Sequence, residues 1–230
     1  MPKVEFRGVG VSYDETLILD DINLTLTEQR IGIIGENGGG KSTLTRLING
    51  LGEPTTGTVT VDGLDVAEHG KEIRQKVGFV FSDAENQIVM PQVRDDVAFS
   101  LRRFKLPKAE RNQRADAALD RFGLADRAEQ SPHTLSGGQK QLLALAAVLV
   151  IDPVLIIADE PTTLLDLRNR DRIKREFAKL EQQLIVVTHD LEFLSDFDRV
   201  ICIDDHHVAA DGTPDEVISF YRDLMATRPL

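Results

Sequence analysis

The feature that most constrains the fold is Gly35-Glu36-Asn37-Gly38-Gly39-Gly40-Lys41-Ser42, a segment that fits the pattern G-x-x-x-x-G-K-[ST] in full. It lies between a short apolar run, Ile31–Ile34, and a segment with helical spacing, Lys41–Asn49. Glycines allow consecutive backbone N–H groups to turn toward one phosphate, and the helix N-terminus adds the positive end of its dipole. We therefore expect these residues and Thr43 to bind a nucleoside triphosphate, with Lys41 at the β- and γ-phosphates and the Ser42 hydroxyl on Mg²⁺.

Composition excludes several other classes of protein. The chain has 230 residues, with 27 Lys and Arg against 38 Asp and Glu, which gives a formal net charge of −11. Binding to nucleic acid phosphates needs clustered positive charge, so we expect no direct nucleic acid partner. Cys202 is the only cysteine, which excludes an internal disulfide framework and a cluster of thiolate metal ligands.

Neither a signal peptide nor a membrane span is predicted. The N-terminal segment Met1–Arg7 has no apolar core of the kind that signal peptides carry. The longest apolar run, Leu142–Ile151, has about half of the ~20 residues needed to cross a bilayer, and Asp152-Pro153 follows it. We therefore expect a buried helix here, a cytoplasmic chain, and a membrane role only through a partner.

Hydrophobic periodicity predicts a β-rich start, a helical middle and an α/β end. Strands are expected at Val4–Tyr13, Ile18–Leu26, Thr58–Val61, Leu64–Val66, Val154–Ala158, Leu184–Val187, Val200–Asp204 and Val208–Ala210. Helices are expected at Asp95–Leu106, Lys108–Phe122, Gly138–Val150, Arg168–Leu180 and Asp215–Met225.

The predicted fold is a single α/β domain over residues 1–230, because strand–helix alternation at both ends of the chain indicates a mainly parallel sheet. Residues 1–84 and 154–230 are assigned to a P-loop NTPase core that includes an N-terminal antiparallel β subdomain. Residues 85–153 are assigned to an inserted α-helical subdomain.

Two carboxylates follow a second buried strand. Leu155–Ala158 is apolar and leads directly into Asp159 and Glu160. A carboxylate at the sheet edge beside a phosphate loop can hold Mg²⁺, which predicts that role for Asp159. Glu160 would then lie beside the γ-phosphate, placed to take a proton from an attacking water or to orient it. Without the phosphate loop, the same pair would indicate only an acidic strand end before Pro161.

Two further side chains fit the same site. His189 follows the predicted strand Leu184–Val187 and emerges at the same sheet edge, in position to contact the γ-phosphate. Tyr13, one of two tyrosines, ends the first strand and offers a flat apolar ring on which an adenine can stack. A structural histidine and an ordinary core or surface tyrosine are the alternatives to these roles.

Leu135–Gln139 forms a second candidate anion site. Ser136, Gly137, Gly138 and Gln139 combine a small hydroxyl, two glycines and a helix N-terminus. The segment lies about 95 residues beyond the phosphate loop, in the helical insert. Two half-sites on one chain suggest that two chains meet head to tail and complete each other's nucleotide pockets, as a two-fold homodimer held together by ATP.

The chain resembles the nucleotide-binding subunit of an ABC transporter over essentially its whole length. The matching motifs are the Walker A loop at Gly35–Ser42, the Walker B strand at Leu155–Glu160, the signature at Leu135–Gln139, the D-loop at Thr163–Asp166, the switch histidine at His189 and the A-loop aromatic at Tyr13. The resemblance implies an Mg-dependent ATPase that forms a head-to-tail homodimer and drives a membrane partner. It implies that Glu160 is the catalytic base, that His189 assists it, and that Asp166 serves the D-loop. It also implies that the signature residues bind the nucleotide of the other chain.

Within that family, the chain is similar to the energy-coupling factor (ECF) type. The similarity rests on Lys76–Phe81, Glu85–Gln87 and Asp95–Phe99. It implies ATP-driven uptake of vitamins or metal ions at the cytoplasmic face of the membrane, beneath a transmembrane coupling protein and a separate membrane protein that binds the substrate. Gln87 would take part in coupling to the membrane partner. Biotin is the first expectation for the solute, and cobalt or nickel is the second.

Two positions depart from the family pattern. Ser82 stands where the Q-loop normally has a glutamine, after the strand that ends at Phe81, so a contact of its short hydroxyl with Mg²⁺ would run through water. Leu164 stands in the D-loop where a small residue is usual, and its bulk would alter packing across the dimer.

Two alternatives come from other functional classes. The first is a soluble ABC ATPase acting on DNA or ribosomes. The span from Lys41 to Leu135 is too short for the coiled-coil insertion of the DNA-repair type, and translation types pair two ATPase domains in one chain. The second is a nucleotide sensor without turnover, which the presence of Glu160 and His189 opposes.

Overall fold

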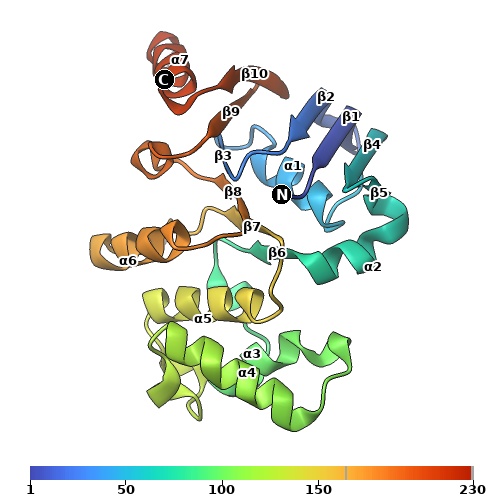
Figure 1. Cartoon of the computed structure of the whole chain (residues 1–230). Coiled ribbons are helices and arrows are strands. Elements are labelled where there is room, and N and C mark those ends of the chain that lie inside the picture. The colour runs from blue at the N-terminus through green and yellow to red at the C-terminus, as the bar shows by residue number, and fades with distance from the viewer. Residues whose placement is uncertain (164, 229–230) are drawn as a thin grey trace. The chain divides into compact units, whose positions relative to one another are not determined.

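The computed structural model describes residues 1–163 and 165–228 (Figure 1). These residues form two compact units. The first contains residues 1–77, 154–159 and those from 181 to the end of the described chain, and the second contains residues 78–153 and 160–180. The second unit is larger than the predicted insert of residues 85–153. Arg172 shows one reason, because its Nη2 donates to the backbone oxygen of Phe122 at 2.8 Å and fastens the later segment to the helical one.

The first unit contains an antiparallel sheet of β1 (Val4–Tyr13), β2 (Thr16–Leu26), β4 (Thr56–Val61) and β5 (Leu64–Asp65), in the order β2-β1-β4-β5. Val4 pairs with Leu26 on one side and with Val61 on the other. Val4 and Phe6 are buried while the residues between and after them are not, as the period of two predicts.

Helix α2 (Val66–Lys76) follows this sheet and was not predicted. We expected a strand over Leu64–Val66, but β5 ends at Asp65, whose carboxylate accepts the N–H of Ala67 at 2.8 Å and caps the helix. Only Val66 and Ile73 of α2 are buried. Its apolar spacing is therefore too sparse for hydrophobic periodicity to reveal it.

A second sheet of the first unit has as neighbours, in this order, β10 (His207–Gly212), β9 (Arg199–Asp204), β3 (Arg30–Gly35), β8 (Gln183–Val187) and β7 (Leu155–Asp159). β3, β7, β8 and β9 run parallel, whereas β9 and β10 form an antiparallel hairpin. All residues of β7 and β8 are buried, which explains their continuous apolar runs. Parallel pairing brings the carboxyl ends of β3, β7 and β8 to one edge. Helices α1 (Lys41–Ile48) and α7 (Pro214–Thr227) complete the unit (Figure 1).

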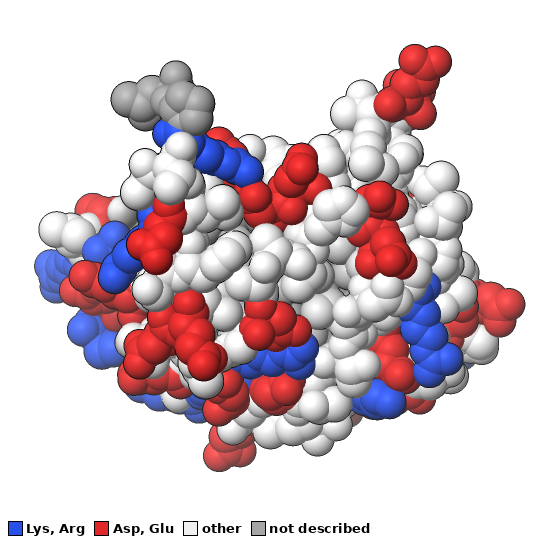
Figure 2. Space-filling view, turned by 90° about the horizontal axis from the view of Figure 1, so that it is seen from above, with Lys and Arg blue, Asp and Glu red and all other residues white. Residues whose placement is uncertain are grey.

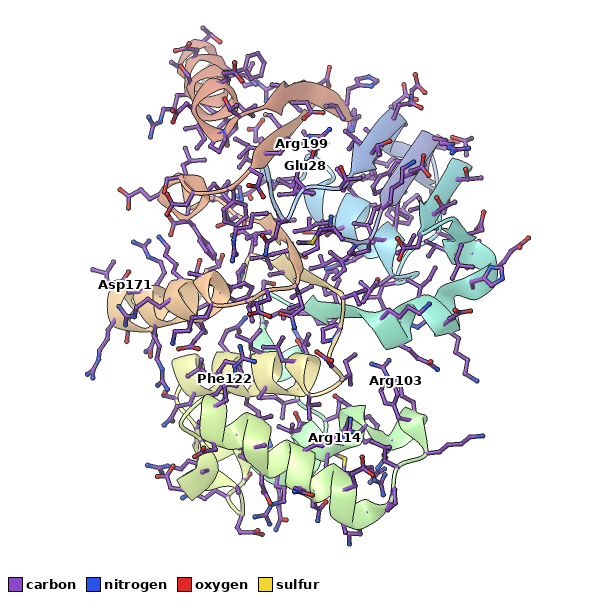
Figure 3. All side chains as sticks on the ribbon, in the orientation of Figure 1. Glu28, Arg103, Arg114, Phe122, Asp171 and Arg199 are labelled. Atoms are coloured by element: carbon purple, nitrogen blue, oxygen red, sulfur yellow. The ribbon has the colours of Figure 1, made fainter. Side chains whose placement is uncertain are left out.

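An ion network holds the closing hairpin. Arg199 and Glu28, labelled in Figure 3, approach with Nη1 and Oε1 3.1 Å apart, and Arg199 Nη2 donates to Asp211 Oδ2 at 2.6 Å. These bonds join β9 and β10 to the turn before β3. The arginine therefore anchors the strand that leads into the phosphate loop.

The second unit is mainly helical. The chain enters it through β6 (Val77–Val80) and forms α3 (Val93–Ser100), α4 (Lys108–Arg121), α5 (Gly137–Leu149) and α6 (Leu167–Ala178) (Figure 1). The helix expected over Asp95–Leu106 stops at Ser100, and a short 3₁₀ turn, Arg102–Phe104, comes before Lys105, whose φ is 55°. Most of α5 is buried, as expected for the run from Leu142. Among the described residues, no helix is long and apolar enough to cross a membrane.

Candidate nucleotide-binding site

The predicted phosphate loop connects β3 to α1 and depends on two closely approached glycines. A Cβ atom at Gly35, where φ is 144°, would lie 2.0 Å from the backbone oxygen of Ile203. At Gly40, where φ is 93°, it would lie 2.7 Å from the backbone oxygen of Ile18. Gly40 is the N-cap of α1 and has no side chain with which to cap the helix. The first N–H groups of α1 therefore stay available for an anion.

Lys41 is the buried cation of this loop. Only 6% of the surface of Lys41 is exposed. The ammonium Nζ donates to the backbone oxygens of Gly35 at 2.9 Å and Glu36 at 2.7 Å. A buried ammonium needs hydrogen-bond acceptors, and a phosphate oxygen accepts a stronger, charge-assisted bond than a carbonyl oxygen does. The loop is therefore built around a positive charge that a phosphate would stabilise.

Ser42 and Asp159 meet beside the loop. The Ser42 hydroxyl donates to Asp159 Oδ1 at 2.8 Å, and Arg46 Nη2 lies 3.7 Å from Asp159 Oδ2. Asp159 ends β7 and is 3% exposed. A hydroxyl and a carboxylate are the hard oxygen donors that Mg²⁺ prefers. The pair fits the predicted ion, and the nearby Arg46 was not foreseen because no motif marks it.

His189 and Tyr13 are both placed by strands of the first unit. Tyr13 ends β1 with 55% of its surface exposed, so its ring is accessible for stacking. His189 lies two residues beyond β8, after the buried Thr188, whose Oγ1 accepts the N–H of Asp190 at 3.0 Å. β8 pairs in parallel with both β3 and β7. His189 therefore lies at the sheet edge where β3 leads into the phosphate loop and where β7 ends at Asp159.

Glu160 and the predicted D-loop belong to the second unit. Glu160 has a left-handed backbone with φ of 51°, and its Oε2 accepts the hydroxyl of Thr163 at 2.9 Å. Asp166 is the N-cap of α6, where its Oδ1 accepts the N–H of Asn169 at 2.8 Å. Leu164 lies outside the described residues. Within this unit, Asp166 therefore has a local structural role besides the predicted one.

The predicted signature begins α5 with a capping box. Ser136 Oγ accepts the N–H of Gln139 at 3.4 Å, and Gln139 Oε1 accepts the N–H of Ser136 at 2.9 Å. A Cβ atom at Gly138 would lie 2.3 Å from Cγ of Asn169, so only glycine fits against α6. At Gly137 a Cβ atom would meet nothing within 4 Å among the described residues. Gly137 therefore presents open backbone.

The segment after β6 contains Ser82, which is exposed, and Gln87, which is not free to reach outward. Gln87 Oε1 accepts the N–H of Phe81 at 3.2 Å, and its Nε2 donates to the backbone oxygen of Ala144 at 3.4 Å. Gln141 Nε2 donates to the backbone oxygen of Phe81 at 3.3 Å. Sequence reasoning did not single out Gln141, because nothing in its spacing marks a bond to a residue 60 positions earlier.

Glu36 of the phosphate loop forms an ion pair with Arg228, whose Nη2 also donates to Asp204 Oδ2 at 2.7 Å. The two partners are 192 positions apart, so no local pattern predicts them.

Figure 2 shows one face of the molecule, on which basic side chains occur in small groups among acidic ones. Acidic side chains also outnumber basic ones in the whole sequence, by 38 to 27.

Comparison with known proteins identifies the family. The family model for ABC transporters matches residues 19–163. The chain belongs to the ABC transporter family. It has the mixed α/β fold of this family's ATP-binding domains, including the antiparallel sheet and the helical insertion, and it is an ATPase. The resemblance to ABC nucleotide-binding subunits is thereby confirmed.

Two curated relatives are similar to this ABC ATPase over nearly its whole length. The biotin transport ATP-binding protein BioM of Rhizobium etli is 45% identical over 97% of this chain and 99% of the relative. The energy-coupling factor transporter ATP-binding protein EcfA1 of Oenococcus oeni is 40% identical over 95% of this chain and 82% of the relative. The predicted similarity to the ECF type is confirmed by these relatives.

Two solved structures share the ABC fold. The structure of cbiO1 from Clostridium perfringens, part of the ABC transporter complex cbiONQ, has a TM-score of 0.82 at 31% identity and covers 97% of this chain and 93% of that one. An ATP-binding cassette solved as a dimer in a post-hydrolysis state with ADP and Pi has a TM-score of 0.81 at 30% identity and covers 92% of this chain and 98% of that one.

Proposed function

We propose that the chain is the ATP-hydrolysing subunit of an ECF-type importer that takes up a vitamin, with biotin as the favoured solute. It would act at the cytoplasmic face of the membrane, with a transmembrane coupling protein and a membrane protein that binds the substrate. The observation that carries the proposal is the buried Lys41 ammonium enclosed by the phosphate loop beside the Ser42–Asp159 pair. The name of EcfA1 supports the type of transporter, and the name of BioM supports the solute.

Nucleotide binding follows from the geometry of the loop. The triphosphate would take the place of the backbone oxygens that Lys41 now contacts, and the first N–H groups of α1 would donate to its oxygens. Ser42 and Asp159 would hold Mg²⁺, which neutralises charge on the phosphates when it is bound. Gly35 to Thr43 would surround the phosphates, and Tyr13 would stack on the adenine.

Hydrolysis assigns a proton transfer to Glu160. Water attacks the γ-phosphorus, the bond from that phosphorus to the bridging oxygen breaks, and ADP and inorganic phosphate result. Glu160 accepts the proton of the attacking water and is held by the Thr163 hydroxyl. His189 would contact the γ-phosphate from the end of β8, and Ser82 would help to hold Mg²⁺ through a water molecule.

A head-to-tail homodimer completes each site. Ser136, Gly137, Gly138 and Gln139 of one chain would bind the nucleotide of the other, and Asp166 would lie at the same interface. The open backbone at Gly137 supports this arrangement, as does the dimeric solved cassette. Hydrolysis would then remove a γ-phosphate contact from both chains and let them separate.

Replacement of the proposed base tests the reaction. Glu160→Gln keeps the shape of the side chain and an acceptor for Thr163, so ATP binding should stay within about twofold of wild type. Turnover should fall by about 10²–10⁴-fold, the range of general-base contributions. The measurements are steady-state phosphate release and equilibrium binding of ATP. Glu53→Gln, a change of an exposed carboxylate, is the control. Wild-type turnover of the Glu160 variant would exclude it as the base.

Membrane partners and solute need a separate experiment. Purification of the tagged chain from detergent-extracted membranes should recover transmembrane proteins, and cells lacking the chain should lose biotin accumulation. The likeness to cbiO1 names no solute, so it does not decide between the two solute classes. Loss of cobalt or nickel accumulation instead would select the second class. Recovery of ribosomes or DNA in place of membrane proteins would favour the soluble alternative.

A further inference from the structure

Both polar backbone groups of Phe81 are bound by glutamine side chains. Its N–H donates to Gln87 Oε1 at 3.2 Å, and its carbonyl oxygen accepts from Gln141 Nε2 at 3.3 Å. Phe81 directly follows β6 and directly precedes Ser82. The peptide groups that position Ser82 are thus held from two sides by side chains.

Each glutamine also reaches or belongs to the signature helix α5. Gln141 lies within α5, five residues after Ser136, and is 3% exposed. Gln87 Nε2 donates to the backbone oxygen of Ala144, which lies farther along α5. The two side chains therefore link the end of β6 to α5, and all of these residues belong to the second unit.

Neighbouring contacts strengthen this link. Lys140 of α5 forms an ion pair with Glu85, and the exposed fraction of the Lys140 side chain is 14%. Asp83 accepts the N–H of Glu85 at 2.9 Å and the Nδ2 of Asn86 at 3.1 Å, which fixes the short turn Ala84–Asn86. Residues 83–87 thereby form a braced segment against α5.

We propose that Gln87 and Gln141 are positioning residues that fix Ser82 relative to the signature at the start of α5. This inference rests on the proposed ATPase cycle. A buried amide is stabilising only when its groups are bonded, and around it α5 is apolar, with Leu142, Leu143 and Leu145 all buried. Leucine would fill the same space at Gln141, so the amide serves a geometric need. Through its bond to Phe81, the Gln141 side chain couples a displacement of Ser82 to the start of α5 at Ser136.

The same bonds determine how Gln87 can take part in coupling. Its carbonyl and amide are both bonded within the second unit, so its effect on coupling passes through α5 and not through direct contact with a membrane partner. The braced segment compensates for the short side chain at Ser82, because a short hydroxyl acts at a distance through water only if its backbone is held in place.

The test compares Gln87→Leu, Gln141→Leu and the double variant with Gln130→Leu. Gln130 is a matched control in the same unit, since its Oε1 accepts from Arg127 and Thr134 but not from Phe81. The affinity for ATP should stay within about twofold, because the phosphate loop lies in the other unit. Turnover should fall by about tenfold in each single variant, and the double variant should be no worse than the poorer single one. Gln87→Glu keeps the acceptor for Phe81 and should retain more activity than Gln87→Leu.

Hydrogen exchange supplies a readout that does not depend on turnover. The Phe81 amide should exchange at least about tenfold faster in Gln87→Leu than in wild type, and Gln130→Leu should leave it unchanged. Unchanged exchange at Phe81 would overturn the inference, as would wild-type turnover of Gln141→Leu. An equal loss of ATP affinity and turnover, or a loss that follows thermal stability alone, would also overturn it. Absence of ATPase activity in the wild type would instead refute the proposed function.

Discussion

The phosphate loop and the signature turn both place glycines before a helix, yet the two helix starts are built differently. α1 begins at Gly40, which has a φ of 93° and no side chain to cap the helix. α5 begins at Ser136, where Ser136 and Gln139 bond each other's backbone N–H groups in a capping box. The first start leaves its N–H groups for a ligand, whereas at the second the side chains of Gln139 and Ser136 bind the N–H groups of Ser136 and Gln139.

The two starts also differ in charge. Lys41 places a buried ammonium within the phosphate loop, whereas the capping box at α5 contains only neutral groups. A phosphate would gain a charge-assisted bond at the first and only neutral donors at the second. We therefore expect the phosphate loop to bind nucleotide by itself, and the signature to add to a site only where another chain supplies the charge.

The largest expected effect removes the charge that separates the two starts. Lys41→Ala should lower the affinity for ATP by at least about 100-fold, because two or more charge-assisted bonds of ~1.5–3 kcal/mol each are lost. Equilibrium binding of ATP measures this effect, with Lys71→Ala on the exposed face of α2 as the control. An unchanged dissociation constant would mean that the buried ammonium is structural, and the contrast with the signature would disappear.

A smaller effect is expected at the capping box. Ser136→Ala should destabilise α5 by ~1 kcal/mol, the usual contribution of an N-cap. It should also lower turnover about tenfold if Ser136 binds the phosphate of the partner chain, since a bond to a charged group contributes at least ~1.5 kcal/mol. Chemical denaturation and phosphate release measure the two losses separately.

The chain supplies a matched control for this change. At the start of α7, Glu216 Oε2 accepts both the N–H of Thr213 at 3.1 Å and its hydroxyl at 2.7 Å, and no nucleotide role is expected there. Thr213→Ala removes the hydroxyl bond at this N-cap and should lower stability with turnover unchanged. Equal effects of both substitutions on turnover would show that Ser136 serves only its own helix, and the signature would lose its proposed role in trans.

Elements with a strong apolar pattern could be predicted from the sequence, because burial on one or both faces dictates that pattern. β1, β7, β8 and α5 are of this kind. α2 escaped because only Val66 and Ile73 are buried in it, and because its start depends on one bond that the N–H of Ala67 donates to Asp65. The grouping of α6 with the helical unit also escaped, since it depends on contacts such as Arg172 with Phe122.

The residues of the candidate site also fall into those that the sequence could predict and those that it could not. The phosphate loop could be predicted because a contiguous motif fixes the backbone, and Ser42 and Asp159 meet as the motif and strand pattern indicated. The bond of Gln141 to Phe81 and the pairing of Glu36 with Arg228 could not, because each joins residues far apart in the chain by side-chain geometry alone. Such bonds depend on tertiary packing, which no local pattern encodes.

The buried carboxylates of the two units extend the comparison. Asp159, in the first unit, faces the hydroxyl of Ser42 and the guanidinium of Arg46. Asp96, in the second, is 4% exposed and accepts the N–H groups of Val89 at 2.8 Å and Met90 at 3.0 Å. Burial raises the pKa of Asp96 above its ordinary value, although the two N–H bonds partly oppose this shift.

The smallest expected effect therefore concerns Asp96 and depends on pH. Because the pKa is higher in the folded than in the unfolded chain, folding favours the protonated carboxyl. The contribution of the protonated Asp96 carboxyl to stability is complete below its pKa in the unfolded chain and is lost as the pH rises through its pKa in the folded chain.

Asp96→Asn keeps an acceptor for both N–H groups and should change the free energy of unfolding at pH 7 by no more than ~1 kcal/mol. Urea denaturation from pH 4 to pH 7 should show the wild type losing stability relative to this variant as the pH rises. Asp95→Asn, on the same helix, should follow the wild type, and parallel profiles of wild type and Asp96→Asn would show that this carboxylate does not distinguish the second unit.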